Sequence, residues 1–261
     1  MSVPPSVQDL IDQSGNSFHA KVARWFRDNG WEVSVSPYYM DQAQQKAREL
    51  DLVVEKLHVM GGTYGDERVV VVTRLFVECK FIPGYGVFWF TAKNRPAVEE
   101  LLCEPGLFRR GNTYTQKHHY LAKDRVAKLF ASSPSRGAQE AEPFYKALNQ
   151  ALNGLVSMRA QEPLSLRNAT QRSNSPIVLD FPVVICSSFE QVYAADFDGV
   201  EPTMQIRENF QLEVQYAYLN GSMQSRNEQF LIDFVEFNQL STLATHVEED
   251  AKLAAFFAAR S

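Results

Sequence analysis

The run RVVVVTRLFVECKF, at residues 68–81, constrains the fold more than any other segment of the chain. Its valines favour an extended conformation, because β-branched side chains pack well on a pleated surface. Its apolar residues are nearly continuous, whereas a strand with one solvated face would alternate apolar and polar residues. We therefore expect a central strand that is covered on both faces, which requires layers on both sides of a sheet.

Helical and extended patterns elsewhere predict an α/β fold with a mixed sheet flanked by helices. Apolar residues at helical spacing predict a helix over residues 6–29, broken near residues 14–16, and alternation predicts a strand over residues 31–36. A second strand over residues 50–59 would join the central strand through a glycine-rich turn at residues 60–66. The remaining patterns predict helices at 115–132, 142–159 and 239–258, strands at 87–90, 177–186, 191–196, 210–219 and 230–237, and loops at 41–48 and 160–176.

The chain has 261 residues, which suits one large domain or a core with an extension. We expect a nuclease-like core at residues 1–165 and a strand-rich extension at 166–261 that ends in a helix and could continue the core sheet. No apolar run approaches the roughly 20 residues that cross a bilayer, and the N-terminus lacks a basic region followed by an apolar stretch. Three cysteines without metal-ligand spacing indicate reduced thiols. A cytoplasmic protein without a membrane partner is therefore expected.

Two charged residues interrupt the apolar run near its end. Glu78 and Lys80 are two positions apart, so in a strand both point to one face and Cys79 points to the other. A buried acid and base are costly unless they pair or bind a metal, and a structural ion pair is the simpler explanation of these two alone. Asp51 opens the preceding strand, and antiparallel pairing would bring it beside Glu78. Two carboxylates beside a lysine form a site for a hard cation such as Mg²⁺ or Mn²⁺.

This arrangement resembles the PD-(D/E)xK superfamily of nucleases, which have the restriction-endonuclease-like fold. Asp51 would be the first acid of the motif, and Glu78-Cys79-Lys80 its second part. The segment GNSFH at residues 15–19, followed by a Gly-Trp pair at 30–31, is similar to the Mrr-like and Holliday-junction-resolvase-like branches. The similarity covers residues 14–92 and, more loosely, the later helices.

The resemblance implies a role for each residue of the site. Asp51, Glu78 and the backbone carbonyl of Cys79 would bind the cation. Lys80 would position the attacking water and stabilise the charge that develops in the transition state. The Cys79 thiol is not expected to act as a nucleophile, since the sequence places no histidine to activate it.

Two positions depart from the family pattern. Leu50 stands where a proline is usual, and His19 replaces a helix acid, which puts a second metal site in doubt. His19 could still contact metal-bound water or phosphate, although a lone helix histidine is more often a surface or core residue. Gln150, in the helix expected at residues 142–159, could correspond to a glutamine that some relatives place near the site.

A basic segment lies in the middle of the chain. Between Arg109 and Arg136 there are seven basic residues and one acidic residue, a local charge of +6 on a chain of net charge −5. Such a stripe can hold a polyanion, although a solvated helix face would look the same. The residues that we expect to contact DNA phosphates are Arg109, Arg110, Lys117, Lys123, Arg125 and Lys128. His118 and His119 are adjacent within this segment, so on a helix they would diverge and would not bind one metal.

These features lead to two hypotheses of different kinds. The first is a Mg²⁺-dependent nuclease that hydrolyses DNA phosphodiester bonds in restriction, anti-phage defence or repair. The alternative is a catalytically inactive protein of the same fold that binds nucleic acid or a protein partner, including a second copy in a homodimer. The sequence has no Walker-type phosphate loop, nucleophile elbow or HExxH motif to suggest another chemistry. Metal-dependent DNA cleavage separates the two hypotheses.

Overall fold

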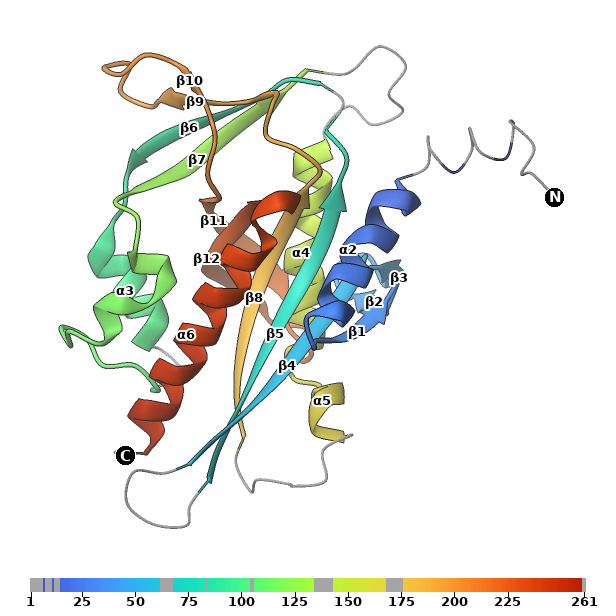
Figure 1. Ribbon diagram of the computed structural model, residues 1–261, viewed down its shortest axis with the longest axis vertical. Coiled ribbons are helices and arrows are strands. Elements are labelled where there is room, and N and C mark those ends of the chain that lie inside the picture. The colour runs from blue at the N-terminus through green and yellow to red at the C-terminus, as the bar shows by residue number, and fades with distance from the viewer. Residues whose placement is uncertain are drawn as a thin grey trace.

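The central feature of the fold is a ten-stranded mixed sheet with helices on both faces (Figure 1). The computed structural model describes residues 15–61, 68–82, 84–103, 106–133, 143–167 and 176–259, together with Val7 and Ile11. In order across the sheet, the strands are β1 (Glu32–Val35), β4 (Leu52–Gly61), β5 (Arg68–Lys80), β8 (Ile177–Cys186), β12 (Ser225–Glu236), β11 (Phe210–Leu219), β7 (Arg125–Ser132), β6 (Gly86–Ala92), β9 (Val192–Asp196) and β10 (Met204–Gln205). A separate hairpin consists of β2 (Tyr38–Asp41) and β3 (Lys46–Glu49).

Strand β5 is central, as its apolar run predicts. It pairs antiparallel with β4 on one side, where Leu52 lies opposite Val77. On the other side it pairs parallel with β8, where Val184 lies opposite Glu78. Pairing with β8 continues through Glu78 and Lys80, whereas pairing with β4 ends at Val77, next to Asp51 and Glu78.

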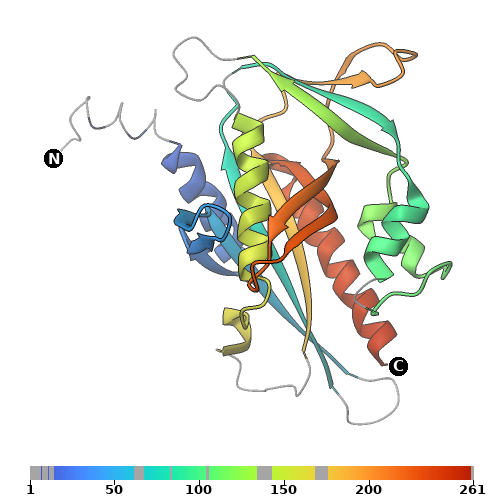
Figure 2. The same ribbon diagram turned by 180° about the vertical axis from the view of Figure 1, so that it is seen from behind.

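Helices cover both faces of the sheet, and the sheet separates two apolar cores (Figures 1 and 2). On one face lie α2 (Asn16–Asp28) and α6 (Leu240–Ala258), whose apolar residues pack against Leu75 and Val77. On the other face lies α4 (Pro143–Met158), which packs against Phe76. Since side chains alternate along β5, Glu78 and Lys80 share the α4 face with Phe76, and Cys79 lies on the α2 face. None of the described helices is long and apolar enough to cross a membrane.

The helix predicted over residues 115–132 is wrong. The structure has two short 3₁₀ turns there, Thr115–Lys117 and His119–Leu121, and then strand β7. Strand β7 pairs with β6 along its length and touches β11 at Ala127, so sheet pairing overrides the helical preference of its lysine, alanine and leucine residues.

Two predicted loops contain regular structure, and one helix was not predicted. The loop predicted at residues 41–48 contains the ends of the β2–β3 hairpin. Helix α3 (Arg95–Cys103) was not predicted, and the short helix α5 (Leu164–Arg167) lies inside the loop predicted at 160–176. Strands β8, β12 and β11 of the predicted extension lie in the same sheet as the core strands, between β5 and β7, an arrangement that the sequence prediction allowed. Most of the predicted turn at 60–66, and Arg136, lie outside the described residues.

Candidate active site

Asp51, Glu78 and Lys80 meet at the C-terminal end of the central strand. The backbone N–H of Asp51 donates to Glu78 Oε1 at 3.2 Å, and the backbone N–H of Cys79 donates to Asp51 Oδ2 at 2.7 Å. Lys80 Nζ lies 3.6 Å from Glu78 Oε2. Asp51 directly precedes β4, and the β4–β5 register brings it opposite Glu78. The structure therefore brings the three predicted residues together.

Burial distinguishes this cluster from a surface ion pair. The Glu78 side chain is 1% exposed and that of Lys80 is 12% exposed, while Asp51 is half-buried. Burial, and next the charge of Asp51, raise the pKa of Glu78 to about 8, although Lys80, the Asp51 N–H and Lys146 act in the opposite direction. The charge of Asp51 therefore opposes the ionisation of Glu78, a conflict that a bound cation relieves.

The donor atoms fit a small hard cation. Among the described residues, each carboxylate accepts a backbone N–H through one oxygen, so its second oxygen remains for a ligand. The second oxygen of Glu78, Oε2, lies beside Lys80. In a strand the N–H and C=O of one residue point to the same side. The Cys79 N–H points at Asp51, so the Cys79 carbonyl also faces Asp51. Carboxylate and carbonyl oxygens are the ligands that Mg²⁺ and Mn²⁺ prefer.

A second set of potential ligand atoms meets at Asp51 from the opposite face. Ligand atoms of His19, Asp51 and Cys79 all lie within 4.8 Å of one another. His19, on α2, donates Nε2–H to the Asp51 carbonyl at 2.7 Å, so it positions the start of β4. The thiol of Cys79 thus lies nearer to a histidine than the sequence indicated. However, burial first, and then Asp51 and Glu78, raise the pKa of Cys79, which keeps the thiol protonated and a weak nucleophile.

Gln150 lies near the site, on α4. Its side-chain Nε2 donates to the backbone carbonyl of Glu49 at 3.1 Å, two residues before Asp51. It contacts neither carboxylate directly. Its position fits a residue that supports the strand leading into the site.

The predicted DNA contacts lie elsewhere in the molecule. Strand β7 is separated from β5 by β8, β12 and β11, which at about 4.8 Å per strand places it roughly 20 Å away. Lys123 and Lys128 already pair with acids, Lys123 with Glu208 at 2.9 Å and Lys128 with Glu213.

The other members of the basic segment differ in their partners. Arg125 contacts both Asp196 and Glu201. Arg109, Arg110 and Lys117 are exposed in the segment that follows α3, and α3 lies on the other side of the molecule from α2 (Figures 1 and 2). A phosphate-binding surface formed by this segment would therefore be remote from Glu78.

The expectation that His118 and His119 diverge is also wrong, because they do not lie on a helix. Both imidazoles contact Asp250 of α6, His118 through Nε2 at 3.3 Å and His119 through Nδ1. His119 Nε2 lies 3.0 Å from Asp233 of β12. Burial would lower the pKa of His119, but Asp250 and Asp233 raise it to about 10, so it carries a charge at neutral pH.

This buried cluster is better described as an ion network than as a metal site. His118 Nδ1 accepts the backbone N–H of Tyr120 at 3.1 Å, so its proton is on Nε2, the atom that faces Asp250. Burial lowers the pKa of His118 to about 4, which keeps it neutral. Lys93 completes the network through Gln211, which in turn donates to Asp233. No signal in the local sequence links these residues, because they come from distant segments.

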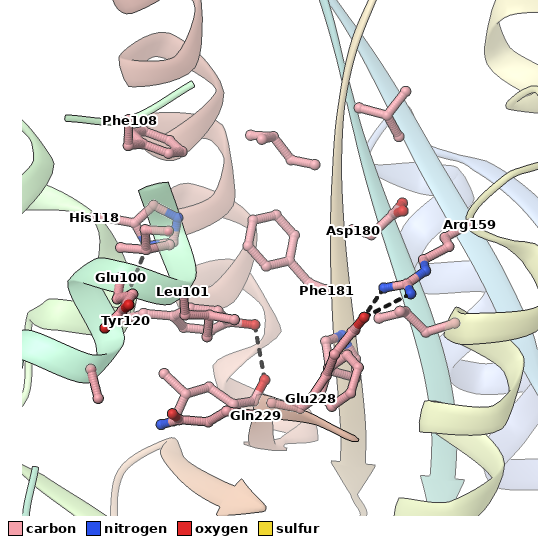
Figure 3. Close-up of a pocket in the computed structure, with 18 of the residues that line it drawn as sticks. Glu100, Leu101, Phe108, His118, Tyr120, Arg159, Asp180, Phe181, Glu228 and Gln229 are labelled. Atoms are coloured by element: carbon pink, nitrogen blue, oxygen red, sulfur yellow. Dashed lines mark hydrogen bonds and ion pairs between the residues drawn. The ribbon is translucent and has the colours of Figure 1, made fainter. Parts of the chain in front are cut away.

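Neither of two cavities among the described residues is lined by Asp51, Glu78 or Lys80. Figure 3 shows a cavity of about 590 Å³ where β8 and β12 separate, lined mainly by apolar residues such as Leu101, Phe108 and Phe181. Part of its polar rim is paired, since Arg159 binds Glu228 and Tyr120 donates to the Leu231 carbonyl, whereas Gln229 Nε2 is buried without a hydrogen-bond partner among the described residues. A second groove, of about 460 Å³, lies between the β2–β3 hairpin and α4 and is more polar.

The fold and the site define an α/β protein with a buried carboxylate pair and a lysine at the end of its central strand. No family model, curated protein or solved structure matches the chain. Function therefore has to be argued from the site itself.

Proposed function

We propose that the chain is a metal-dependent phosphodiesterase that hydrolyses DNA, with Mg²⁺ or Mn²⁺ held by Asp51, Glu78 and the Cys79 carbonyl. The observation that carries this proposal is the meeting of two carboxylates and a lysine around a buried strand end. The resemblance to PD-(D/E)xK nucleases supports it, because the same residues form that motif. Such an activity would suit restriction, anti-phage defence or repair.

A purely structural ion pair accounts for the arrangement less well. Glu78 and Lys80 alone would form such a pair, and one acid would balance one base. Asp51 adds a second negative charge that raises the pKa of Glu78. A second acid in a buried pair destabilises the metal-free protein, so its presence favours a ligand that needs both carboxylates.

The protein groups have separate tasks in this proposal. A bound cation supplies the Lewis acidity that activates water and neutralises the phosphate charge. Asp51 and Glu78 orient that cation. The Lys80 ammonium, held beside Glu78, orients the attacking water by hydrogen bonding and stabilises the negative charge on the phosphate oxygens. His19 keeps the Asp51 backbone in place through its carbonyl.

Cleavage of circular and linear DNA, with Mg²⁺, with Mn²⁺ or with a chelator, tests the proposal. We expect metal-dependent cleavage by the wild type and a loss of about 100-fold or more in Lys80→Ala. Lys56→Ala is a matched control, because Lys56 also pairs with a glutamate, Glu248, at 2.5 Å but lies outside the site. Inactive wild type, or equal activity of Lys80→Ala and Lys56→Ala, would favour the inactive binding protein instead.

A further inference from the structure

The polar groove beside α4 has three walls. The β2–β3 hairpin contributes Tyr39 and Arg48, α4 contributes Tyr145 and Gln150, and β11 contributes Tyr216. Figure 2 shows α4 between the β2–β3 hairpin and the β11–β12 hairpin. At one end the two hairpins touch, where Gln45 contacts Met223.

This groove adjoins the candidate active site. Lys146, which lines the groove, lowers the pKa of Glu78 through its charge. In turn, burial first and then the charge of Glu78 raise the pKa of Tyr39. Gln150 is bonded to Glu49, two residues from Asp51. A ligand in the groove would therefore lie next to the carboxylates.

Two buried polar atoms in the groove have no hydrogen-bond partner among the described residues. They are the hydroxyl of Tyr39, a residue that is 4% exposed, and Oε1 of Gln150. The orientation of the Gln150 amide is fixed, because the Glu49 carbonyl can only accept and must face Nε2. Buried polar atoms are nearly always paired in native proteins, and a polar ligand in the groove would supply partners for both atoms.

The character of the groove favours a neutral ligand over an isolated anion. Arg48 is already paired with Asp41 at 2.8 Å. The groups without partners are a hydroxyl and an amide oxygen, both uncharged. Beside them lie two aromatic rings: Tyr145 is 56% exposed, and Tyr216 is half-buried. An aromatic ring can stack on the face of a nucleobase, and a hydroxyl donor beside an amide acceptor can form hydrogen bonds with its edge.

We propose that this groove binds an unstacked nucleobase of a single-stranded nucleic acid, with Tyr145 stacking on its face and Tyr39 and Gln150 bonding its edge. The inference deepens the proposed function, because it names the form of substrate that would reach Asp51 and Glu78. Every base presents a donor beside an acceptor on its Watson–Crick edge, and in a duplex that edge is occupied. The groove therefore selects single strands over duplexes and discriminates little between bases.

Binding by full-length Lys80→Ala without metal tests the proposal, with a single strand of about 12 nucleotides and the matching duplex as probes. We expect the single strand to bind at least tenfold more tightly than the duplex. Tyr145→Ala should weaken single-strand binding by about tenfold, the usual effect of losing one stacked base. Phe197→Ala is the matched control, since Phe197 is also exposed but follows β9, outside both the groove and the basic segment.

Tyr39→Phe gives a second readout that does not depend on a large truncation. Removing a buried hydroxyl that lacks a partner should raise the melting temperature of the ligand-free protein, and it should weaken single-strand binding several-fold. A stabilised Tyr39→Phe variant with unchanged binding would overturn the proposal. Equal affinity for single strand and duplex, or equal affinity of Tyr145→Ala and Phe197→Ala, would also overturn it.

The two proposals can fail independently. If single-strand binding depends on Tyr145 and Tyr39 but the wild type cleaves nothing with metal, the groove is confirmed and the phosphodiesterase is wrong. If the wild type cleaves DNA but the groove variants bind and cleave as the wild type does, only the groove proposal is wrong.

Discussion

The backbone N–H of Asp51 donates to the Glu78 carboxylate, at an N···Oε1 distance of 3.2 Å. In return the Asp51 carboxylate accepts the N–H of Cys79, the residue next to Glu78, at 2.7 Å. Each acid is therefore held by the backbone of the strand that carries the other. The spacing of the two carboxylates is built into the pairing of β4 and β5.

Asp51→Asn should abolish metal-dependent cleavage while the fold is retained. The asparagine oxygen can still accept the Cys79 N–H, and loss of the charge relieves repulsion with Glu78. Without metal, stability should stay equal or rise. Cleavage assays and chemical denaturation with a chelator measure the two effects. An unfolded Asp51→Asn variant, or a folded one with normal activity, would mean that Asp51 has a structural role.

The stability of the metal-free protein should carry a pH dependence from Glu78. Burial and Asp51 raise the pKa of Glu78 from 4.5 to about 8, so the folded state retains a proton that the unfolded state loses in this range. The stability that comes from this retained proton is fully present below pH 4.5 and is lost as the pH rises towards 8. Over this range the free energy of unfolding should fall by at most about 1.4 kcal/mol per pH unit.

Glu78→Gln isolates that contribution. The glutamine does not titrate, so the variant should gain stability relative to the wild type as the pH rises from 4.5 to 8, measured by denaturation with a chelator. Added Mg²⁺ should reduce the difference, because it stabilises the ionised wild type. A difference that is constant with pH would show that Glu78 titrates normally.

Cys79→Ser separates two modes of metal binding at Asp51. If the cation is held by oxygens, as we propose, the variant should keep its activity with Mg²⁺ and Mn²⁺, because the Cys79 backbone carbonyl is unchanged. If His19, Asp51 and the thiol instead hold a softer ion, affinity for Zn²⁺ should be high in the wild type and fall in Cys79→Ser. Calorimetric titration with each metal, together with cleavage rates, distinguishes the oxygen ligands from the set formed by His19, Asp51 and the thiol.

Asp250→Asn should destabilise the protein strongly, by about 3–5 kcal/mol, because it removes a buried carboxylate that faces the charged His119. Glu249→Gln is the matched control on the same helix. Glu249 pairs with Lys252 at 2.5 Å on an exposed surface, so its loss should change stability little. Urea denaturation at neutral pH compares them, and equal effects would contradict a buried ion network.

Charge reversal tests whether the basic segment binds DNA. The double variant Arg109→Glu with Arg110→Glu, in the Lys80→Ala background, should weaken DNA binding. The slope of log affinity against log salt concentration should become shallower by about 1 for each lost phosphate contact. Lys123→Glu with Lys128→Glu should have a smaller effect on DNA binding, because Glu208 and Glu213 already neutralise these lysines. If neither double variant changes the slope of log affinity against log salt concentration, the basic segment is a solvated surface that does not bind DNA.

The site was accessible from the sequence because its geometry is local. Alternation places Glu78 and Lys80 on one face, and a single hairpin brings Asp51 opposite Glu78, so two simple rules suffice. The central strand was equally accessible, since only a strand covered on both faces tolerates such a continuous apolar run.

The sequence failed where structure depends on distant segments. The helical pattern at residues 115–132 is overridden by pairing of β7 with β6. The network around His119 joins residues of a 3₁₀ turn, β12 and α6, which no local pattern connects. The groove beside α4 likewise requires the β2–β3 hairpin and β11, which the sequence does not bring together.

The parallel pairing of β5 with β8 sets the order in which the protein can be assembled during synthesis. Glu78 lies opposite Val184, and Lys80 lies opposite Cys186, about a hundred residues later. Chains emerge from the ribosome N-terminus first. When the acids and the lysine have left the exit tunnel, one edge of their apolar strand still has no neighbour, and unpaired edges promote aggregation. The strand stays in this state until Cys186 emerges, so that interval is when the nascent chain most needs chaperone protection.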